Sequence, residues 1–544
     1  MSGNKEFSVE DLLIGIIRIF AVIILAYLFF LTVFTTSPLK SENVPLPEDG
    51  ITIFGIDPVQ VADSPMIHAM VIGAFVVILF LISRKMIKVP NVSALKKWHL
   101  YVLFFVVGVI YLVTLNSHPI SDPLKVLNIA EQILQGDYST FTEVDGYMHR
   151  YPFQNAIVLL DMGLVKVFGE HAFFAYQLIN LFSQLVFIGF MGKSLELAWG
   201  RDSRIVGLSK MMIILFPVFF LYITYNYGNV ISMALIMVSI YFEQLYFRNH
   251  MIRNLLCGSI FAALACVMKS NSRIIVIAMI ICLLLDFIKS RNKYNILFIV
   301  LLVVLRMAAF AAVNNSMEAI TGIDTPKGMP MINWVCIGIS GDGPYNGVSV
   351  SIYEDAGYDY DKSVEYAKEF IKLRMHKMMD RKSELIRWFG RKMAVAWSNP
   401  TFDSFELSSH DDSRVLGAFY TSLVEGNIRT ILEKYLNLFQ SVILFLTLLF
   451  VISTKKIDTE KIVMILATLG GFAFHIIWES GAHYVLPYFM FLFPYAANGI
   501  CLIVDSFREK NFRVFRNIAV ILAIGVCIYQ LKDIRIVGLA FFAS

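Results

Sequence analysis

Long apolar runs constrain this chain more strongly than any other feature of its sequence. The first, from Leu12 to Phe34, is long enough to cross a bilayer at about 1.5 Å per helical residue, and comparable runs recur almost to the C-terminus. Hydrophobic residues make up 57% of the chain and charged residues only 16%, and the mean hydropathy is +0.66. This composition excludes a soluble protein of 544 residues and predicts an all-α polytopic membrane protein.

The spacing of the runs predicts about thirteen transmembrane helices in five parts of the chain. The predicted spans are 12–34, 66–83, 99–116, 173–199, 208–225, 230–247, 255–268, 274–288, 296–313, 435–453, 462–479, 484–504 and 518–530. The parts are N-terminal helices (1–116), a first large loop with juxtamembrane helices (117–170), central helices (171–313), a small α-rich loop domain (314–434) and C-terminal helices (435–544).

The distribution of lysine and arginine predicts the orientation of these spans in a cell membrane. The connection between the second and third spans holds Arg84, Lys85, Lys88, Lys96 and Lys97, and cytoplasmic loops are enriched in such residues. The segment Ser117–Gln154 and the 314–434 domain are then extracytoplasmic. The run Phe153–Phe168 must be a surface-lying or re-entrant helix, because a crossing would place the basic end of the next span outside.

The segment Ser117–Gln154 is polar and acidic between long apolar spans, and we place the chemistry there. Asp122 and Pro123 precede an amphipathic run that Gly136 ends, with an apolar stripe at helical spacing formed by Leu124, Leu127, Ala130 and Leu134. Two interpretations of Asp122 stay open at this point. It is either a helix N-cap followed by proline, or a carboxylate that accepts a proton from a hydroxyl at the membrane face.

Further polar groups are predicted at the same face. Lys269 and Arg273 stand at a span boundary, where a lysine usually extends to the headgroups but where two cations also suit a lipid phosphate. The turn Trp478–Tyr488 carries Glu479, His483 and Tyr484. Residues 341–347 (GDGPYNG) suit a substrate-facing loop, and 362–397 is typical of one or two basic amphipathic helices on anionic headgroups.

The order of these motifs resembles the polyprenyl-phosphate-sugar-dependent glycosyltransferases of the integral membrane C-type (GT-C) fold, a group with protein O-mannosyltransferases and lipid A aminoarabinose transferases. The closer resemblance is to uncharacterised bacterial members of this group. The segments that carry it are Ser121-Asp122, Gly136-Asp137-Tyr138, Tyr151-Pro152-Phe153-Gln154, Tyr227-Gly228-Asn229, Lys269-Ser270-Asn271, GDGPYNG, and Trp478-Glu479 with Tyr484-Val485-Leu486-Pro487-Tyr488.

The resemblance implies that a sugar moves from a polyprenyl-phosphate donor to a hydroxyl of a cell-envelope acceptor, with inversion, on the extracytoplasmic face. It places Asp122 as the base, and Asp137 or Asp145 as a possible second acid. It assigns substrate binding to Tyr151, Gln154, Lys269, Arg273, Glu479, His483 and Tyr484. His483 would make phosphate binding pH-dependent if it contacts that group.

Other classes fit the sequence less well. A transporter or flippase of a lipid-linked sugar or polysaccharide is favoured by charges within spans, and Arg306 and Lys193 are such charges, but each stands singly and no internal repeat is visible. A polymerase or ligase of surface polysaccharide shares the lipid-linked substrate. The sequence shows no phosphate-binding glycine loop or metal-ligand spacing, so we expect neither a cofactor nor a metal, and no nucleic-acid partner.

Overall fold

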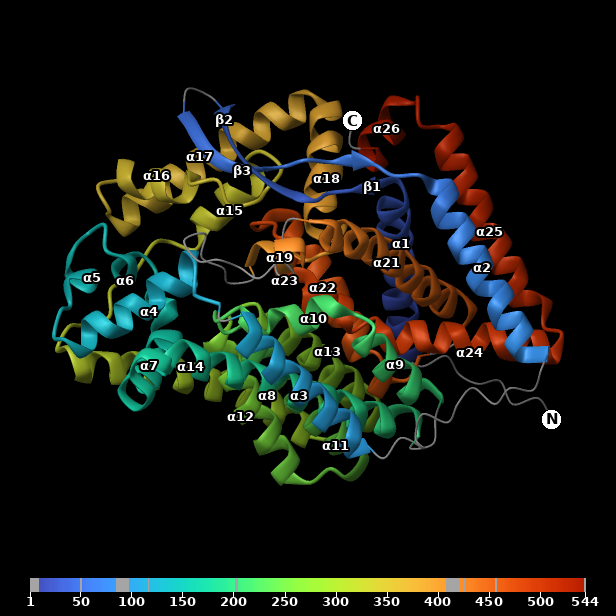
Figure 1. Cartoon of the computed structure of the whole chain (residues 1–544), viewed down its shortest axis with the longest axis horizontal. Coiled ribbons are helices and arrows are strands. Elements are labelled where there is room, and N and C mark those ends of the chain that lie inside the picture. Colours follow the sequence, from blue (N-terminus) through green and yellow to red (C-terminus); the bar gives the residue numbers. More distant parts are fainter. Residues whose placement is uncertain are drawn as a thin grey trace.

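The computed structural model describes residues 9–48, 51–84, 97–115, 117–200, 204–407, 421–423, 426–454 and 457–542. Helices form nearly all of this described part, and Figure 1 shows them gathered around one another, with the helices of the 314–434 region along one side. Residues 85–96 of the basic connection, together with Arg201, Lys455 and Lys456, lie outside the described residues.

The apolar runs fold as helices because their backbone groups can pair within the segment. From the N-terminus these are α1 (Val9–Phe34), α2 (Pro65–Arg84), α3 (Lys97–Leu115), α7 (Asn155–Phe168), α8 (Ala172–Trp199), α9 (Arg204–Ile214), α10 (Pro217–Leu221), α11 (Asn229–Asn249), α12 (Ile252–Met268), α13 (Ser272–Ser290) and α14 (Tyr294–Thr321). Towards the C-terminus they are α21 (Asn427–Ser453), α22 (Val463–Ile477), α23 (Ala482–Met490), α24 (Phe493–Glu509), α25 (Phe512–Gln530) and α26 (Arg535–Phe541).

The prediction of a polytopic helical membrane protein is confirmed. Within the described residues, seven helices are long and apolar enough to cross a membrane, or nine if each of two bent pairs is one span. The bent pairs are 204–214 with 217–224, and 482–490 with 493–509. This number is smaller than the predicted thirteen. The stretches 101–114, 252–268 and 463–477 are apolar but shorter, and the predicted span 274–288 is not among the candidates.

The acidic, proline-containing segment between α1 and α2, which the sequence predicts as a loop, contains β-strands. Strands β2 (Leu39–Glu48) and β3 (Ile51–Pro58) form an antiparallel hairpin, and β1 (Thr35–Thr36) pairs with β4 (Val61–Ala62). The segment brings the chain back from the end of α1 to the start of α2.

The predicted juxtamembrane helix is α4 (Ser121–Leu134), followed by α5 (Ser139–Thr142), α6 (Tyr147–Arg150) and the 3-10 turn η2 (Pro152–Gln154). Half of the predicted stripe was wrong: Leu124 and Leu134 are exposed, whereas Ala130 is buried and Leu127 is partly buried. The buried face, packed on α7, consists of Pro123, Val126, Ile129, Ala130 and Ile133. Both faces of this short helix are rich in apolar residues, so spacing alone could not select the one that tertiary packing buries.

The loop domain is helical, but its borders differ from the predicted 314 and 434, because α14 and α21 both run into it. Its helices are α15 (Ile332–Ile339), α16 (Val348–Asp355), α17 (Tyr360–Asp380), α18 (Lys382–Trp397) and α19 (Ser404–Leu407). A small core of Cys336, Val348, Ile352 and Ala367 holds α15 to α17 together. The predicted basic segment 362–397 forms two helices, α17 and α18, one of the two arrangements expected from the sequence.

Candidate active site

Asp122 lies in a chain of hydroxyl groups. The Tyr227 hydroxyl donates to Asp122 Oδ2 over 3.1 Å and accepts from Gln154 Nε2 over 2.6 Å. The Tyr147 hydroxyl lies 3.1 Å from that of Tyr227 and must be the donor of this pair, because the Tyr227 proton points to the carboxylate. The residue before the first turn of α4 is Ile120, without a side-chain cap, so the capping interpretation of Asp122 was wrong.

Gly228 allows the backbone beside Tyr227 to approach the backbone beside Lys269 closely. This glycine has φ of +76°, and a Cβ atom on it would stand 2.4 Å from the backbone oxygen of Met268. Its amide donates to the Tyr176 hydroxyl over 3.0 Å. The loop before α11 can therefore pack directly against the C-terminal end of α12, where Lys269 is the C-cap residue.

Lys269 places its ammonium among aromatic rings. Its Nζ lies 4.1 Å from the centre of the Tyr227 ring and 5.9 Å from that of Tyr484. Burial lowers the pKa of Lys269 to about 8, although the charges of Asp122 and Glu479 oppose this change. Burial also raises the pKa of Tyr227 well above its usual range, so this phenol stays a proton donor. The result is one carboxylate and one ammonium facing the same tyrosine.

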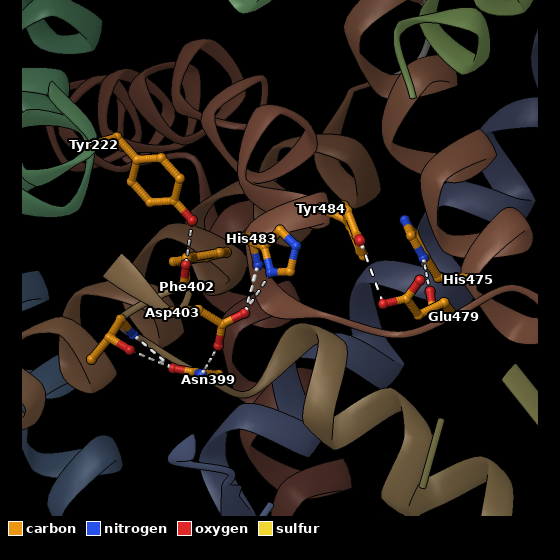
Figure 2. Close-up of polar contacts among 9 residues, drawn as sticks. Tyr222, Asn399, Phe402, Asp403, His475, Glu479, His483 and Tyr484 are labelled. Atoms are coloured by element: carbon orange, nitrogen blue, oxygen red, sulfur yellow. Dashed lines mark hydrogen bonds and ion pairs between the residues drawn. The ribbon is translucent and has the colours of Figure 1, made fainter. Parts of the chain in front are cut away.

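The turn between α22 and α23 supplies the second carboxylate. Glu479 is buried, and its Oε1 accepts from the Tyr484 hydroxyl at a long 3.4 Å, while its backbone oxygen accepts from His475 Nδ1 over 2.9 Å (Figure 2). Burial raises the pKa of Glu479 to about 7, with Lys269 acting in the opposite direction. Near neutral pH this group can therefore act as a proton donor or as an anion.

The carboxylate of Asp403 holds His483 in place. Figure 2 shows the Asp403 carboxylate between His483 and Asn399: it accepts from the backbone amide and Nδ1 of His483 over 3.1 and 2.8 Å, and from Asn399 Nδ2 over 2.7 Å. The ring of His483 lies 3.9 Å from that of Tyr484, and both line a small cavity with Lys269. Since Nδ1 faces Asp403, Nε2 is the nitrogen available for another partner.

A buried lysine ties the loop domain to this turn. Lys392 of α18 donates to the backbone oxygen of Trp478 over 2.8 Å and to that of Gly338. The amide of Ser480 donates to the backbone oxygen of Gly343 over 2.7 Å, which joins the GDGPYNG loop to the same turn. Lys392 and the GDGPYNG loop thus fix the backbone before and after Glu479, respectively.

Replacing Lys392 by methionine should loosen this turn. Methionine fills the space of the lysine stem but leaves two buried backbone oxygens without their charged donor, and a hydrogen bond to a charged group contributes about 1.5–3 kcal/mol. We expect the amide of Ser480 to exchange with solvent about tenfold faster or more, measured by hydrogen–deuterium exchange. Lys382→Met, at an exposed position of the same helix, is the control. Equal exchange in the two variants would show that Lys392 does not hold the turn.

The structure brings most of the predicted residues together and separates one of them. Asp122, Gln154, Lys269, Glu479 and Tyr484 form the cluster described above. Tyr151 packs beside it, with its ring 4.9 Å from that of Tyr147.

Arg273 points away from this cluster, because its guanidinium lies over the Phe310 ring of α14 at 5.0 Å and faces the charge of Arg306. Asp137 and Asp145 are both exposed, and Asp137 accepts from the amide of Ser139, so neither is placed beside Asp122. The carboxyl group whose pKa is raised by the charge of Asp122 is that of Glu479.

Sequence reasoning missed four residues of the site. Tyr147 and Tyr227 were not assigned, although Tyr227 belonged to a quoted motif. Lys392 and Asp403 carried no local signal, since their partners lie about eighty residues away in the chain. Within the described part, no three His, Cys, Asp or Glu side chains converge as a group that could hold a metal ion.

The helices and their apolar surfaces define an integral membrane protein. The chain belongs to the family described as conserved hypothetical integral membrane proteins, which matches residues 16–499. It is distantly similar to the crystal structure of ArnT from Cupriavidus metallidurans bound to undecaprenyl phosphate. The identity is 12%, the likeness covers 75% of this chain and 78% of that chain, and the TM-score is 0.32. Among curated proteins, none matches this chain.

Proposed function

We propose that this protein is a glycosyltransferase of the GT-C fold, which transfers a sugar from a polyprenyl-phosphate donor to an acceptor hydroxyl on the extracytoplasmic face of the cell membrane. The observation that carries the proposal is that Asp122 and Lys269 both contact Tyr227, Asp122 at its hydroxyl and Lys269 over its ring. A base for the acceptor and a cation for the leaving phosphate are the two groups that this reaction requires.

The motif segments support the same proposal by their position. The 117–154 segment, Tyr227-Gly228, Lys269 and Trp478-Glu479 come from four distant parts of the sequence and meet in one cluster. The backbone amide of Ser480, the residue after Glu479, donates to Gly343 of the GDGPYNG loop. These are the segments whose order resembles the GT-C glycosyltransferases.

In this reaction Asp122 accepts the proton of the acceptor hydroxyl as its oxygen bonds to the anomeric carbon. The bond from that carbon to the phosphate oxygen breaks, and the anomeric configuration inverts. Lys269 stabilises the charge that develops on the departing lipid phosphate. Tyr227 orients the carboxylate, and Gln154 and Tyr147 in turn orient Tyr227.

A lipid-linked sugar transporter or flippase remains the second candidate, because such a protein also needs charged groups within the membrane region. The buried Glu243 in α11, whose two carboxylate oxygens lack a hydrogen-bond partner, is the observation in its favour. The two functions are separated by incubating membranes that carry the chain with radiolabelled polyprenyl-phosphate sugars. We expect the label to appear in a non-lipid product, whereas label that crosses the bilayer still attached to its lipid would favour the transporter.

The pKa of Lys269 predicts a pH dependence of donor binding. A group with a pKa of about 8 is charged below this pH and loses its proton above it, so polyprenyl-phosphate binding should weaken as the pH rises from about 7 to 9. Glu479, with its pKa raised to about 7, gains negative charge in the lower part of this range and acts in the same direction.

The Lys269→Arg variant isolates the lysine contribution, because a guanidinium stays charged throughout this range. In the wild type, the affinity for a fluorescent polyprenyl phosphate should fall about tenfold between pH 7 and pH 9. In the variant, the decrease in affinity above pH 8 should be absent. Parallel pH profiles of the two proteins would remove Lys269 from the phosphate site.

A further inference from the structure

A second site lies in a groove between α3, α8, α9 and α11, which Figure 1 shows side by side. The groove has a volume of about 720 Å³. Its wall is largely apolar and aromatic, and Phe182 is 63% exposed at its edge. The apolar residues and tyrosines that line it are Tyr101, Phe182, Leu185, Val186, Phe190 and Tyr241. A groove of this size accommodates an acyl chain.

Three charged side chains also line this groove: Lys193, Lys210 and Glu196. Lys193 was expected to stand alone in its span, and that expectation was wrong. Its ammonium lies 4.5 Å from the centre of the Phe190 ring and 5.9 Å from that of Tyr241. The Lys210 ammonium rests on Gly192 of α8, where a Cβ atom would come within 2.8 Å of it. With one carboxylate against two ammonium groups, the groove favours an anion.

The groove lies far from the Asp122 site along the helices. Tyr101 is near the start of α3, whereas Asp122 follows the other end of this helix, which is about 21 Å from Tyr101 by the helical rise. Lys193 is similarly near the end of α8, roughly 9 Å before Trp199. An exposed lysine this close to the end of a membrane helix, with apolar groups beside it, can place its ammonium group at the level of the lipid phosphates.

We propose that this groove binds an anionic phospholipid of the membrane leaflet opposite the Asp122 site, with the lipid phosphate at Lys193 and Lys210 and an acyl chain along Phe182, Val186 and Phe190. The occupant is a lipid of the bilayer and not free phosphate, because the apolar wall continues from the two ammonium groups to the exposed Phe182. The site is independent of the proposed sugar transfer.

The test measures lipid binding to the purified full-length protein by native mass spectrometry, with phosphatidylglycerol and phosphatidylcholine of identical acyl chains. The wild type should bind phosphatidylglycerol at least tenfold more tightly than phosphatidylcholine. Each lysine near a membrane surface adds roughly fivefold to the affinity for an anionic lipid, so Lys193→Gln with Lys210→Gln should weaken the tightest phosphatidylglycerol site about thirtyfold. Lys166→Gln with Lys293→Gln, two exposed lysines elsewhere, matches the change in charge and should have no effect.

A charge-neutral variant tests the apolar part separately. Gly189 faces the groove with only the Tyr101 hydroxyl near it, at 3.9 Å, so Gly189→Leu fills the groove without changing its charge and should weaken both lipids. Millimolar inorganic phosphate should not displace the lipid. Equal phosphatidylglycerol affinity in the two double variants, unchanged binding in Gly189→Leu, or displacement by inorganic phosphate would each overturn the proposal.

Discussion

Replacing Asp122 by asparagine should reduce sugar transfer by about 10²–10⁴-fold, the usual contribution of a positioned general base. The amide has nearly the same shape, and its oxygen can still accept the Tyr227 hydrogen bond, so the packing of α4 should be preserved. The loss should appear mainly in kcat, because a group that accepts a proton only as the bond forms contributes little to ground-state binding. Initial rates with a saturating donor measure this effect.

Two further variants control for effects on folding and orientation. Asp137→Asn changes an exposed carboxylate in the same segment, which accepts only from the amide of Ser139, and should retain activity. Tyr227→Phe removes the hydroxyl that orients Asp122 and should cause a smaller loss, about tenfold. If folded Asp122→Asn protein transferred sugar at the wild-type rate, Asp122 would not be the base.

Replacing Lys269 by methionine should cost about 10²–10³-fold in kcat/KM, as does removal of a preorganised group that stabilises developing charge. The donor phosphate is anionic before the reaction and gains charge as the sugar leaves, so we expect KM to rise and kcat to fall together. Removal of the ammonium also leaves Asp122 and Glu479 without the cation between them.

Lys269→Arg should recover part of the activity, because it restores the charge but not the compact shape of the ammonium group. Lys166→Met, at an exposed position at the end of α7, controls for the loss of a positive charge. A methionine variant with normal KM and normal kcat would show that another group binds the phosphate.

The sequence alone predicted a polytopic helical membrane protein, although with more spans than the described residues show, and it predicted that distant motifs lie at one face. Both predictions have a simple physical basis. Apolar runs of sufficient length have few structures available besides a helix in a membrane. Counting the spans then placed Ser117–Gln154, Lys269 and Glu479 at one face, and the structure brings Asp122, Lys269 and Glu479 close enough to influence one another's charge.

Other features could not be predicted because tertiary contacts decide them. The buried face of α4 depends on where α7 lies, and Asp403 and Lys392 act on residues about eighty positions away. Arg273 is four residues from Lys269, yet α13 begins between them and directs its side chain towards α14. Proximity in sequence therefore suggested one cation pair where the structure has two separate environments.

The most direct test of the proposed function follows sugar and lipid together in vesicles that contain only the purified protein, a labelled polyprenyl-phosphate sugar and a soluble acceptor alcohol. The proposal predicts one polyprenyl phosphate released for each sugar transferred, and a product with the anomeric configuration opposite to that of the donor. Transfer with retained configuration would contradict the role of Asp122. Movement of the intact donor across the bilayer, with no transfer to any acceptor offered, would contradict the assignment as a glycosyltransferase.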